Sequence, residues 1–257
     1  MGYGMSISVD VILSYLESRL TPKEFKDYCP NGLQIEGTQT IKKIITGVTA
    51  SQALIDQAIA ENADLLLVHH GFFWKGENSC ITQTKKKRIK ALLDHDINLV
   101  AYHLPLDAHP EVGNNAMLAR KLGISVTGGL EPNNPRSVGN IGELEEPITA
   151  QAFAERIAYE LNRAPLLIEG GSHLIRSVAF CTGGAQGYIE KAIALGADAY
   201  ISGEVSEQTF HSAVENNIHY FAAGHHATER YGVQALGEEL ALKFDIEHQF
   251  IDINNPV

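Results

Sequence analysis

The feature that most constrains the fold of this chain is an internal repeat. The segment IDQAIAENAD at residues 55–64 matches IEKAIALGAD at residues 189–198 at a constant offset of 134, and an apolar run follows both segments. A second match, between residues 97–101 and 218–222, has an offset of 121, so the extra 13 residues of the first copy fall in the loop after His70. Although two unrelated α/β units can look alike, this fixed register favours a true duplication.

The hydrophobic pattern predicts alternating strands and helices. The four residues after Asp64 form a continuous apolar run, which is typical of a strand buried on both faces of a parallel sheet. Ser8 is a candidate N-cap for the first helix. This order predicts βαβ units and a layered α/β fold. We expect helices over residues 9–19, 51–62, 85–95, 114–122 and 150–161, and strands over residues 44–48, 64–68, 99–102, 166–168, 178–181 and 219–223.

A length of 257 residues suits one large domain or two small ones. Residues 126–176 differ from the rest, because they are rich in Gly, Pro, Asn and Glu and carry one helix and one short strand. We therefore expect a first α/β half with an N-terminal helix at residues 1–125, an inserted small α+β subdomain at residues 126–176, and a second α/β half at residues 177–257. The two similar, duplicated halves would form a three-layer α/β/α core.

The composition and charge of the chain exclude several classes of protein. Apolar residues make up 44% and charged residues 20%, which are ordinary globular values, and no apolar stretch is long enough to span a membrane. The formal net charge is -11, which argues against a protein that coats nucleic acid, since such binding depends on clustered positive charge. Three widely spaced cysteines allow no disulfide framework and indicate a reduced, cytoplasmic location.

Residues with metal-binding or catalytic chemistry concentrate at the ends of three predicted strands. In open α/β sheets, ligands bind at the carboxyl ends of strands, so these groups converge if the strands are neighbours. Each has a simpler explanation when taken alone: a His pair is often a polar loop, and Asp107 could cap the next helix. The His225 and Glu229 pair has the i, i+4 spacing of one helix face, which is usually surface decoration. The residues concerned are His69, His70, His103, Asp107, His225, His226 and Glu229.

The joint pattern is what favours metal binding. Imidazole and carboxylate ligands without a thiolate suit Zn, Mn, Fe, Co or Ni better than Ca or Mg. Two or three histidines with two carboxylates exceed what one mononuclear site normally uses. A bridging carboxylate would let two divalent metal ions lie about 3.5–4 Å apart and share a hydroxide.

Four motifs in this sequence resemble those of the Nif-three-like family, whose members are commonly named type-two GTP cyclohydrolase I homologues. The motifs cover nearly the whole chain and follow the family's order and spacing. The resemblance implies an α/β fold of two similar halves, a two-metal site and a ring-shaped homohexamer. The motifs are HHGFFW from His69, YHLPLD ending at Asp107, DAYISGE ending at Glu204 and GHHATE ending at Glu229, and the block NGLQ at residues 31–34 also fits.

The resemblance also implies roles for individual residues. His103 and His226 would be the catalytic candidates, lying behind the ligands or facing the substrate. This chain has Gly71 where some relatives have Pro, and its middle insertion is smaller than in many of them. Neither departure touches a ligand, although the small insertion could alter the pocket or the ring. The implied metal ligands are His69, His70, Asp107, His225 and Glu229, with Glu229 as the bridge.

Three other features have two interpretations each. The basic run at residues 85–88 is usually a solvated helix start, and a phosphate or nucleic-acid contact is the alternative. Trp74, which lies with Phe72 and Phe73, could stack on a nucleobase or anchor a subunit interface. The Gly-rich turn at residues 182–187 lacks a nucleotide-binding motif, so we favour tight packing over contact with a phosphate.

The leading functional hypothesis is a di-metal-dependent hydrolase that acts on a small molecule, with a nucleotide as one candidate. In the family's reaction a metal-activated hydroxide would attack C8 of GTP, but that substrate comes from the resemblance, because nothing in these residues selects guanine. The alternative is a non-catalytic metal-binding scaffold, a metal chaperone or an interaction protein. A hydrolase needs open coordination positions and a pocket with convergent polar groups, whereas a scaffold needs neither. The net charge of -11 disfavours a ring that threads DNA.

Overall fold

The computed structural model describes residues 6–257, which form two compact units. Unit 1 consists of Met1–Leu106, described from residue 6, and Gly232–Asn254; unit 2 consists of Asp107–Tyr231 and Asn255–Val257. The chain passes between the units within helices α4 (Leu104–Ala108) and α9 (His225–Phe244). Within residues 6–257, no helix has both the length and the apolar character that a membrane span requires.

Unit 1 is built on a five-stranded sheet whose strand order is β13-β4-β5-β6-β2. Four of these strands run parallel, and β2 pairs with β6 in the antiparallel sense at one edge. A short antiparallel pair, β1 with β3, lies outside this sheet. The bounds are β1 (Ile7–Ser8), β2 (Gly32–Ile35), β3 (Thr40–Ile41), β4 (Lys43–Thr49), β5 (Leu65–His70), β6 (Asn98–Ala101) and β13 (Glu247–Phe250).

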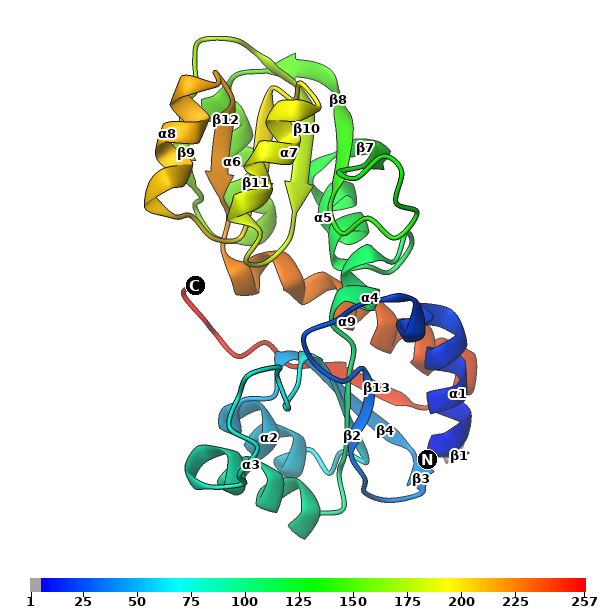
Figure 1. The fold of residues 1–257 in the computed structure, drawn as a ribbon. Helices are drawn as coiled ribbons and strands as arrows, with labels where there is room; N and C mark the ends of the chain where they lie inside the picture. Colours follow the sequence, from blue (N-terminus) through cyan, green and yellow to red (C-terminus); the bar gives the residue numbers. More distant parts are fainter. Residues whose placement is uncertain (1–5) are drawn as a thin grey trace. The chain divides into compact units, whose positions relative to one another are not determined.

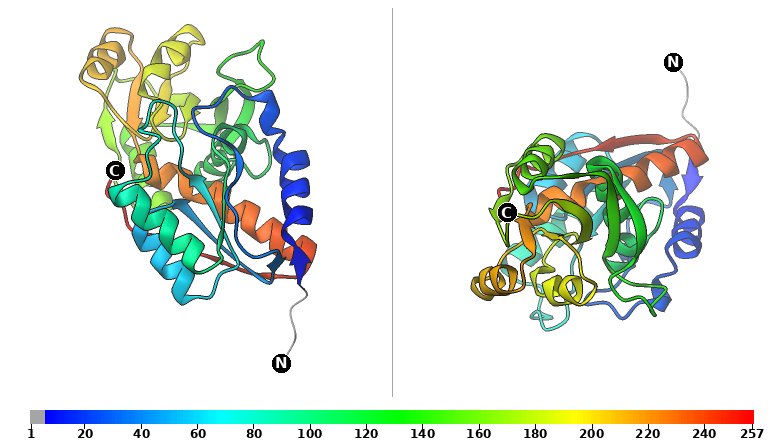
Figure 2. Two further views of the ribbon diagram at one scale, coloured as in Figure 1. Left: turned by 60° about the horizontal axis from the view of Figure 1, so that its bottom comes forward. Right: turned by 90° about the horizontal axis from the view of Figure 1, so that it is seen from above.

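Helices cover both faces of the unit 1 sheet, which gives three layers (Figure 1). α2 (Gln52–Ala60) and α3 (Gln83–Asp94) share an apolar cluster with β4, β5 and β6 on one face, and Figure 2 shows these two helices side by side. α1 (Val9–Leu20) and the unit 1 part of α9 lie on the other face. There, Arg19 bonds Glu239, and Gly237 of α9 closely approaches Thr46 of β4. The 3-10 helix η1 (Pro22–Glu24) follows α1.

Unit 2 is built on a six-stranded sheet with the order β7-β8-β10-β11-β12-β9. β10, β11 and β12 run parallel, and β8 and β9 flank them in the antiparallel sense. The strands are β7 (Ile124–Gly129), β8 (Asn140–Ile148), β9 (Leu166–Ile168), β10 (Ile175–Cys181), β11 (Ala199–Ser202) and β12 (His219–Ala222). The helices are α5 (Asn114–Leu122), α6 (Ala150–Leu161), α7 (Ile189–Ala194) and α8 (Glu207–Glu215), with the 3-10 helix η2 (Gln186–Tyr188) before α7.

The helices of unit 2 also lie on both faces of its sheet. α5 and α6 share an apolar cluster with one face, and α7 and α8 share a second cluster with the other face. Each unit is therefore a three-layer α/β/α arrangement, and the predicted α/β fold class is confirmed. Local signals worked as expected at the first helix, because Ser8 caps α1 by accepting a hydrogen bond from the backbone of Asp10.

The predicted duplication is present in the register of the parallel strands. At the offsets read from the sequence, four of the five residue pairs between β4 and β5 and all four pairs between β5 and β6 have their counterparts in unit 2. β4, β5 and β6 are therefore matched by β10, β11 and β12. The diagnostic pairs are Ile44 with Leu65 and Leu65 with Asn98 in unit 1, and Val178 with Ala199 and Ala199 with His219 in unit 2.

The duplication extends further than the sequence pattern indicates. In both sheets the third parallel strand carries an antiparallel edge strand, β2 on β6 and β9 on β12, and a helix precedes that edge strand, α1 or α6. The segment predicted as an insertion, residues 126–176, thus contains the start of the second copy. The composition of residues 126–176 differs from that of the rest of the chain. Pairing between distant strands nevertheless makes them part of the second copy, and composition does not encode such pairing. The compact units divide the chain after residues 106, 231 and 254, whereas the sequence pattern places divisions after residues 125 and 176.

One carboxylate in each copy fixes the register of the parallel strands. The Asp64 carboxylate, just before β5, accepts hydrogen bonds from two successive backbone N–H groups at the start of β4, at 2.7 and 2.9 Å. Asp198, just before β11, does the same at the start of β10, at 2.9 and 2.8 Å. These two residues end the repeated sequence motif, so the motif has a structural cause.

Replacing Asp198 by alanine is expected to lower the free energy of unfolding by about 2 kcal/mol, because two backbone donors lose a charged acceptor. Urea denaturation of the Asp198→Ala variant tests this. Asp56→Ala is the control, since Asp56 is exposed, its carboxylate accepts from the side chain of Gln52, and its loss should change the free energy by less than about 0.5 kcal/mol. Equal effects of the two substitutions would contradict the anchoring role of Asp198.

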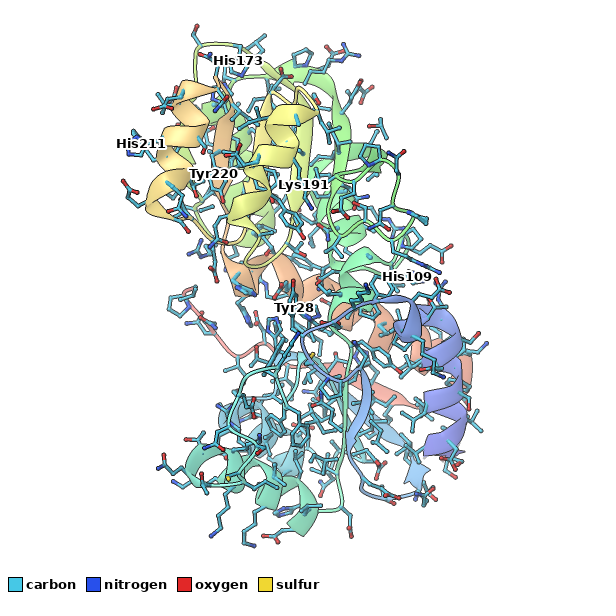
Figure 3. All side chains as sticks on the ribbon, viewed as in Figure 1. Tyr28, His109, His173, Lys191, His211 and Tyr220 are labelled. Carbon is cyan, nitrogen blue, oxygen red and sulfur yellow. The ribbon has the colours of Figure 1, made fainter. Side chains whose placement is uncertain are left out.

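His219 in the second copy stands where the first copy has an asparagine. Asn98 donates from its side-chain amide to the carbonyl of Thr38 at 2.7 Å, and His219 donates from Nε2 to the carbonyl of His173 at 3.1 Å. The rings of His173 and His219 have centroids 4.2 Å apart, and Figure 3 shows His173 at the end of unit 2 where these strands begin. Burial is the main cause that holds the pKa of His219 below its ordinary value of 6.5.

The free energy of unfolding is expected to fall as the pH drops below about 6.5, because the unfolded chain accepts a proton that the folded chain resists placing on His219. Above that pH His219 is neutral in both the folded and the unfolded chain, so its contribution to the free energy of unfolding does not change with pH. His219→Asn introduces the residue that the first copy has at this position, Asn98, and should make the free energy of unfolding depend less on pH. Urea denaturation near neutral pH and at about pH 5 measures it. His211→Asn, at an exposed histidine of α8, should leave the dependence unchanged; a full slope in His219→Asn would rule out this origin.

Candidate functional site

Three histidines from two strand ends form one group in unit 1, the histidine group: His69, His70 and His103. His69 and His70 are the last residues of β5, which runs two residues further than predicted, and His103 follows β6. One potential ligand nitrogen of each histidine lies within 4.8 Å of those of the other two. β5 and β6 are hydrogen-bonded parallel neighbours, so their carboxyl ends bring these rings together as the sequence predicts.

Hydrogen bonds between Nδ1 and an oxygen atom orient the two histidines of β5. His69 is fully buried, and its Nδ1 lies 2.9 Å from the carbonyl oxygen of Tyr102, to which it donates. That bond places the proton on Nδ1 and the lone pair on Nε2, the arrangement that metal-ligating histidines commonly adopt. Nδ1 of His70 lies 3.1 Å from the hydroxyl of Thr49 on β4. Both Nε2 atoms are therefore the candidate metal ligands.

A buried aspartate that the sequence pattern does not reveal holds His103. The carboxylate of Asp27 lies 2.6 Å from Nδ1 of His103, and it also accepts from the side chain of Asn31 at 2.8 Å. Asn31 in turn accepts from the backbone N–H of His103 at 2.8 Å. Burial raises the pKa of Asp27, but its bonds to His103, Asn31 and the backbone outweigh burial and hold the pKa below its ordinary value. Asp27 lies four residues before the NGLQ block, but this position gives no sign of a contact with His103.

Cys29 lies beside this pair but is poorly suited to bind a metal. Its Sγ and ligand atoms of Asp27 and His103 lie within 4.8 Å of one another. Burial raises the pKa of the Cys29 thiol to about 12, so the thiol stays protonated at neutral pH, whereas the thiolate is the form that binds metals. The imidazole and carboxylate donors therefore remain the candidates.

Trp74 forms an aromatic wall beside the histidine group. Its ring meets that of His103 edge to face, with 5.0 Å between centroids, and lies 5.8 Å from that of His70. Its Nε1 donates to the carbonyl of Gly71 at 3.1 Å, which fixes the indole against its own loop. Trp74 thus has a defined place in unit 1 next to the predicted ligands.

A second group, the carboxylate group, lies in unit 2: Asp107, His225 and Glu229. His225 and Glu229 lie one turn apart at the start of α9, with Nε2 of His225 3.2 Å from Oε2 of Glu229. Ligand oxygens of Asp107 and Glu229 lie within 4.8 Å of each other, and the two residues are only 5% and 3% exposed. Asn114 donates to the Asp107 carboxylate at 2.8 Å. Glu229 of the i, i+4 pair is therefore buried, and His225 is half-buried, so the pair is not surface decoration.

Glycines make room for the carboxylate group. Gly183, just after β10, has φ +69°, and a Cβ there would lie 2.0 Å from Oε1 of Glu229 and 3.1 Å from Nε2 of His225. Gly203, just after β11, is crowded too, because its Cβ would lie 2.6 Å from Cα of His225. The Gly-rich turn at residues 182–187 is thus a packing turn against this group, the interpretation that the sequence favours.

Two glutamates surround the ring of His225. Its Nδ1 lies 2.7 Å from Oε1 of Glu204, and its Nε2 faces Glu229. Burial lowers the pKa of His225, but the two carboxylates raise it more strongly, to about 9. The imidazole is therefore cationic at neutral pH when no metal is bound. A metal ion on Nε2 would take the place of a proton, so metal affinity should rise with pH.

The structure gathers six of the seven predicted residues into two groups, one in each unit. Their donor set, imidazole nitrogens and carboxylate oxygens without a thiolate, fits a transition-metal ion such as zinc or manganese. The seventh residue, His226, is buried, and its backbone N–H donates to the carbonyl of Val257 at 3.0 Å. Within residues 6–257, no cluster of three potential ligands includes His226. Its catalytic role stays a prediction.

Solved structures share this fold over nearly the whole chain. One, described as protein ybgI of unknown function, has a TM-score of 0.94 and 49% sequence identity, and the match covers 98% of this chain and 100% of that one. Another, TTHA1606 from Thermus thermophilus, has a TM-score of 0.89 and 34% identity, with the same coverage of 98% and 100%. These likenesses agree with the α/β architecture described above.

Sequence comparison gives the family. A Pseudomonas aeruginosa relative is 57% identical over 252 residues, which are 98% of this chain and 100% of the relative. An Escherichia coli relative is 52% identical over 242 residues, which are 94% and 96% of the two chains. Both relatives are named GTP cyclohydrolase 1 type 2 homolog. The model of the Duf34/NIF3 (NGG1p interacting factor 3) family matches residues 7–256, so the resemblance seen in the motifs is confirmed and the chain belongs to this family.

Proposed function

We propose that this chain is a di-metal-dependent hydrolase whose metal ligands are His69, His70, Asp107, His225 and Glu229. The observation that carries the proposal is the burial of Asp107 and Glu229 with ligand oxygens within 4.8 Å of each other. Two carboxylates buried this close repel each other unless cations balance them. His225 supplies one positive charge, and a divalent metal ion would supply a stronger one. The fixed tautomer of His69 adds a neutral donor of the kind that such metals bind.

A pair of divalent metal ions, when bound, acidifies water and polarises the bond that is attacked. His103 and Trp74 would handle the proton and the substrate. Asp27 engages Nδ1 of His103, so His103 would accept or donate a proton at Nε2. Trp74, edge to face with His103, would exclude water on one side and line the space for a flat substrate.

The substrate proposed for the first test is GTP. The support is the name that the close relatives carry, GTP cyclohydrolase 1 type 2 homolog. Other nucleotides and small esters or amides suit the same chemistry, so they follow in the screen. The homohexameric ring and the cytoplasmic location stay predictions, and sedimentation of the purified protein measures the first of them.

The purified wild type is expected to hold about two divalent metal ions per chain and to hydrolyse GTP or another member of the screen. Glu229→Gln should lose at least one ion, because the amide is a weaker ligand than the carboxylate. His103→Gln should keep its ions and lose activity by roughly a hundredfold or more. Mass spectrometry counts the metals, and product analysis measures turnover. Glu207→Gln, at a glutamate whose side chain is 84% exposed on α8, is the control for both readouts.

Three outcomes separate the hypotheses. A wild type without metal, even after addition of Zn or Mn, would eliminate the metal ligands and with them the hydrolase. Two bound ions without turnover of any substrate in the screen would favour the scaffold alternative. Metal loss in the control as well as in Glu229→Gln would show that Glu229 has no special role.

Gly183→Ala is expected to weaken metal binding at least about tenfold, because the added Cβ would displace the Glu229 carboxylate and the His225 ring. Calorimetric titration with Zn measures the affinity. Gly196→Ala is a matched control: Gly196 has φ +70°, so the backbone strain is the same, but its Cβ would meet nothing within 4 Å. If both variants lose affinity equally, backbone strain rather than crowding of the carboxylate group is responsible.

A further inference from the structure

Glu204 is a carboxylate beside the candidate ligands that has no assigned role. It lies two residues after β11, and its Oε1 accepts a hydrogen bond from Nδ1 of His225 at 2.7 Å. Its Oε2 lies 3.4 Å from Nε2 of Gln186, which also donates to the hydroxyl of Ser206 at 3.2 Å. The Glu204 carboxylate is therefore held by Gln186 as well as by His225.

The duplication shows which residue of the first copy corresponds to Glu204. At the offset of 134 that relates β5 to β11, Glu204 corresponds to His70 and Gly203 corresponds to His69. The second copy cannot carry a histidine at position 203, because even a Cβ there would lie 2.6 Å from Cα of His225. The candidate metal ligand in this copy is instead His225 at the start of α9, and the end of β11 is followed by Glu204, which contacts the other edge of the His225 ring.

Glu204 and Glu229 approach opposite edges of the same ring. Nδ1 of His225 faces Glu204 at 2.7 Å, and Nε2 faces Glu229 at 3.2 Å. Gly184 lies against both side chains, since a Cβ there would be in ordinary van der Waals contact, 3.5 Å from both the Glu204 carboxyl and Cε1 of His225. A metal ion bound to Nε2 is therefore beyond the reach of the oxygen on Nδ1, so Glu204 does not share that ion through this atom.

We propose that Glu204 is a positioning residue, which holds the His225 ring with its proton on Nδ1 and thereby presents Nε2 to a divalent metal ion. This inference rests on the proposed function, because it adds a residue to the same metal site. A carboxylate behind a ligating histidine fixes the ring orientation and makes Nε2 a stronger donor, and its loss commonly weakens metal binding 10–100-fold.

The first test is zinc affinity, measured by competition with a chromophoric chelator. Glu204→Ala is expected to bind zinc roughly 10–100-fold more weakly than the wild type. Glu204→Gln keeps an oxygen that can accept from Nδ1, so it should restore part of the affinity. Glu207→Gln, which alters an exposed glutamate five residues from this strand, should match the wild type. Unchanged affinity in Glu204→Ala would overturn the proposal.

The second test needs no metal, so it separates this inference from the proposed function. Nitrogen NMR of the metal-free protein, recorded at a pH where the His225 ring is neutral, reports which ring nitrogen holds the proton. The wild type and Glu204→Gln should carry it on Nδ1, and Glu204→Ala should shift it towards Nε2. The wild-type pattern in Glu204→Ala would overturn the proposal whatever its zinc affinity. If the wild type binds no zinc but the proton moves, the metal function fails and the positioning role of Glu204 stands.

Discussion

The parallel sheet of each unit depends on one aspartate, which lies just before a strand and binds the backbone at the start of the neighbouring strand. Asp64 and Asp198 each accept two backbone N–H groups, so each closes a βαβ turn in one register. Side chains alternate between the faces of a strand, and a slip of one residue would send each of them to the opposite face. The position of every residue at the carboxyl end of β5 and β11, including His69 and His70, therefore depends on these bonds.

A shared register has allowed the two copies to diverge in chemistry. The first copy ends β5 with two histidines, whereas the second has Gly203 and Glu204 at the matching positions. Backbone packing against the start of α9 forbids a side chain at position 203, so the donors of the second copy come from that helix. Duplication thus supplied two equivalent strand ends, and local crowding decided which of them could carry ligands on the strand itself.

The sequence predicts the parts of the fold that local patterns encode, and it predicts less where distant segments meet. Most of the amphipathic helices and buried strands, and the repeat, were readable, and α6 occupies the predicted residues 150–161, whereas α8 and β13 were not among the predicted elements. The strand β9 was predicted at residues 166–168, but its place in the sheet was not, because a run of three apolar residues carries no sign that it pairs with β12. Among site residues, motif spacing marks His69 and His225. Asp27 contacts His103 across 76 residues of sequence, so only the folded chain reveals it.

Three histidines of the candidate site share one hydrogen-bond pattern. His69, His103 and His225 each engage an oxygen through Nδ1, at 2.9, 2.6 and 2.7 Å, so Nε2 is the nitrogen that points away from the supporting acceptor. The acceptors differ in charge, since His69 has a backbone carbonyl and the other two have carboxylates. A carbonyl selects a tautomer without adding charge, whereas a carboxylate also favours positive charge on the ring or on a bound metal. All three rings have Nε2 as the candidate metal ligand. The group that accepts from Nδ1 decides whether negative charge lies behind that ligand, as it does for His103 and His225, or not, as for His69.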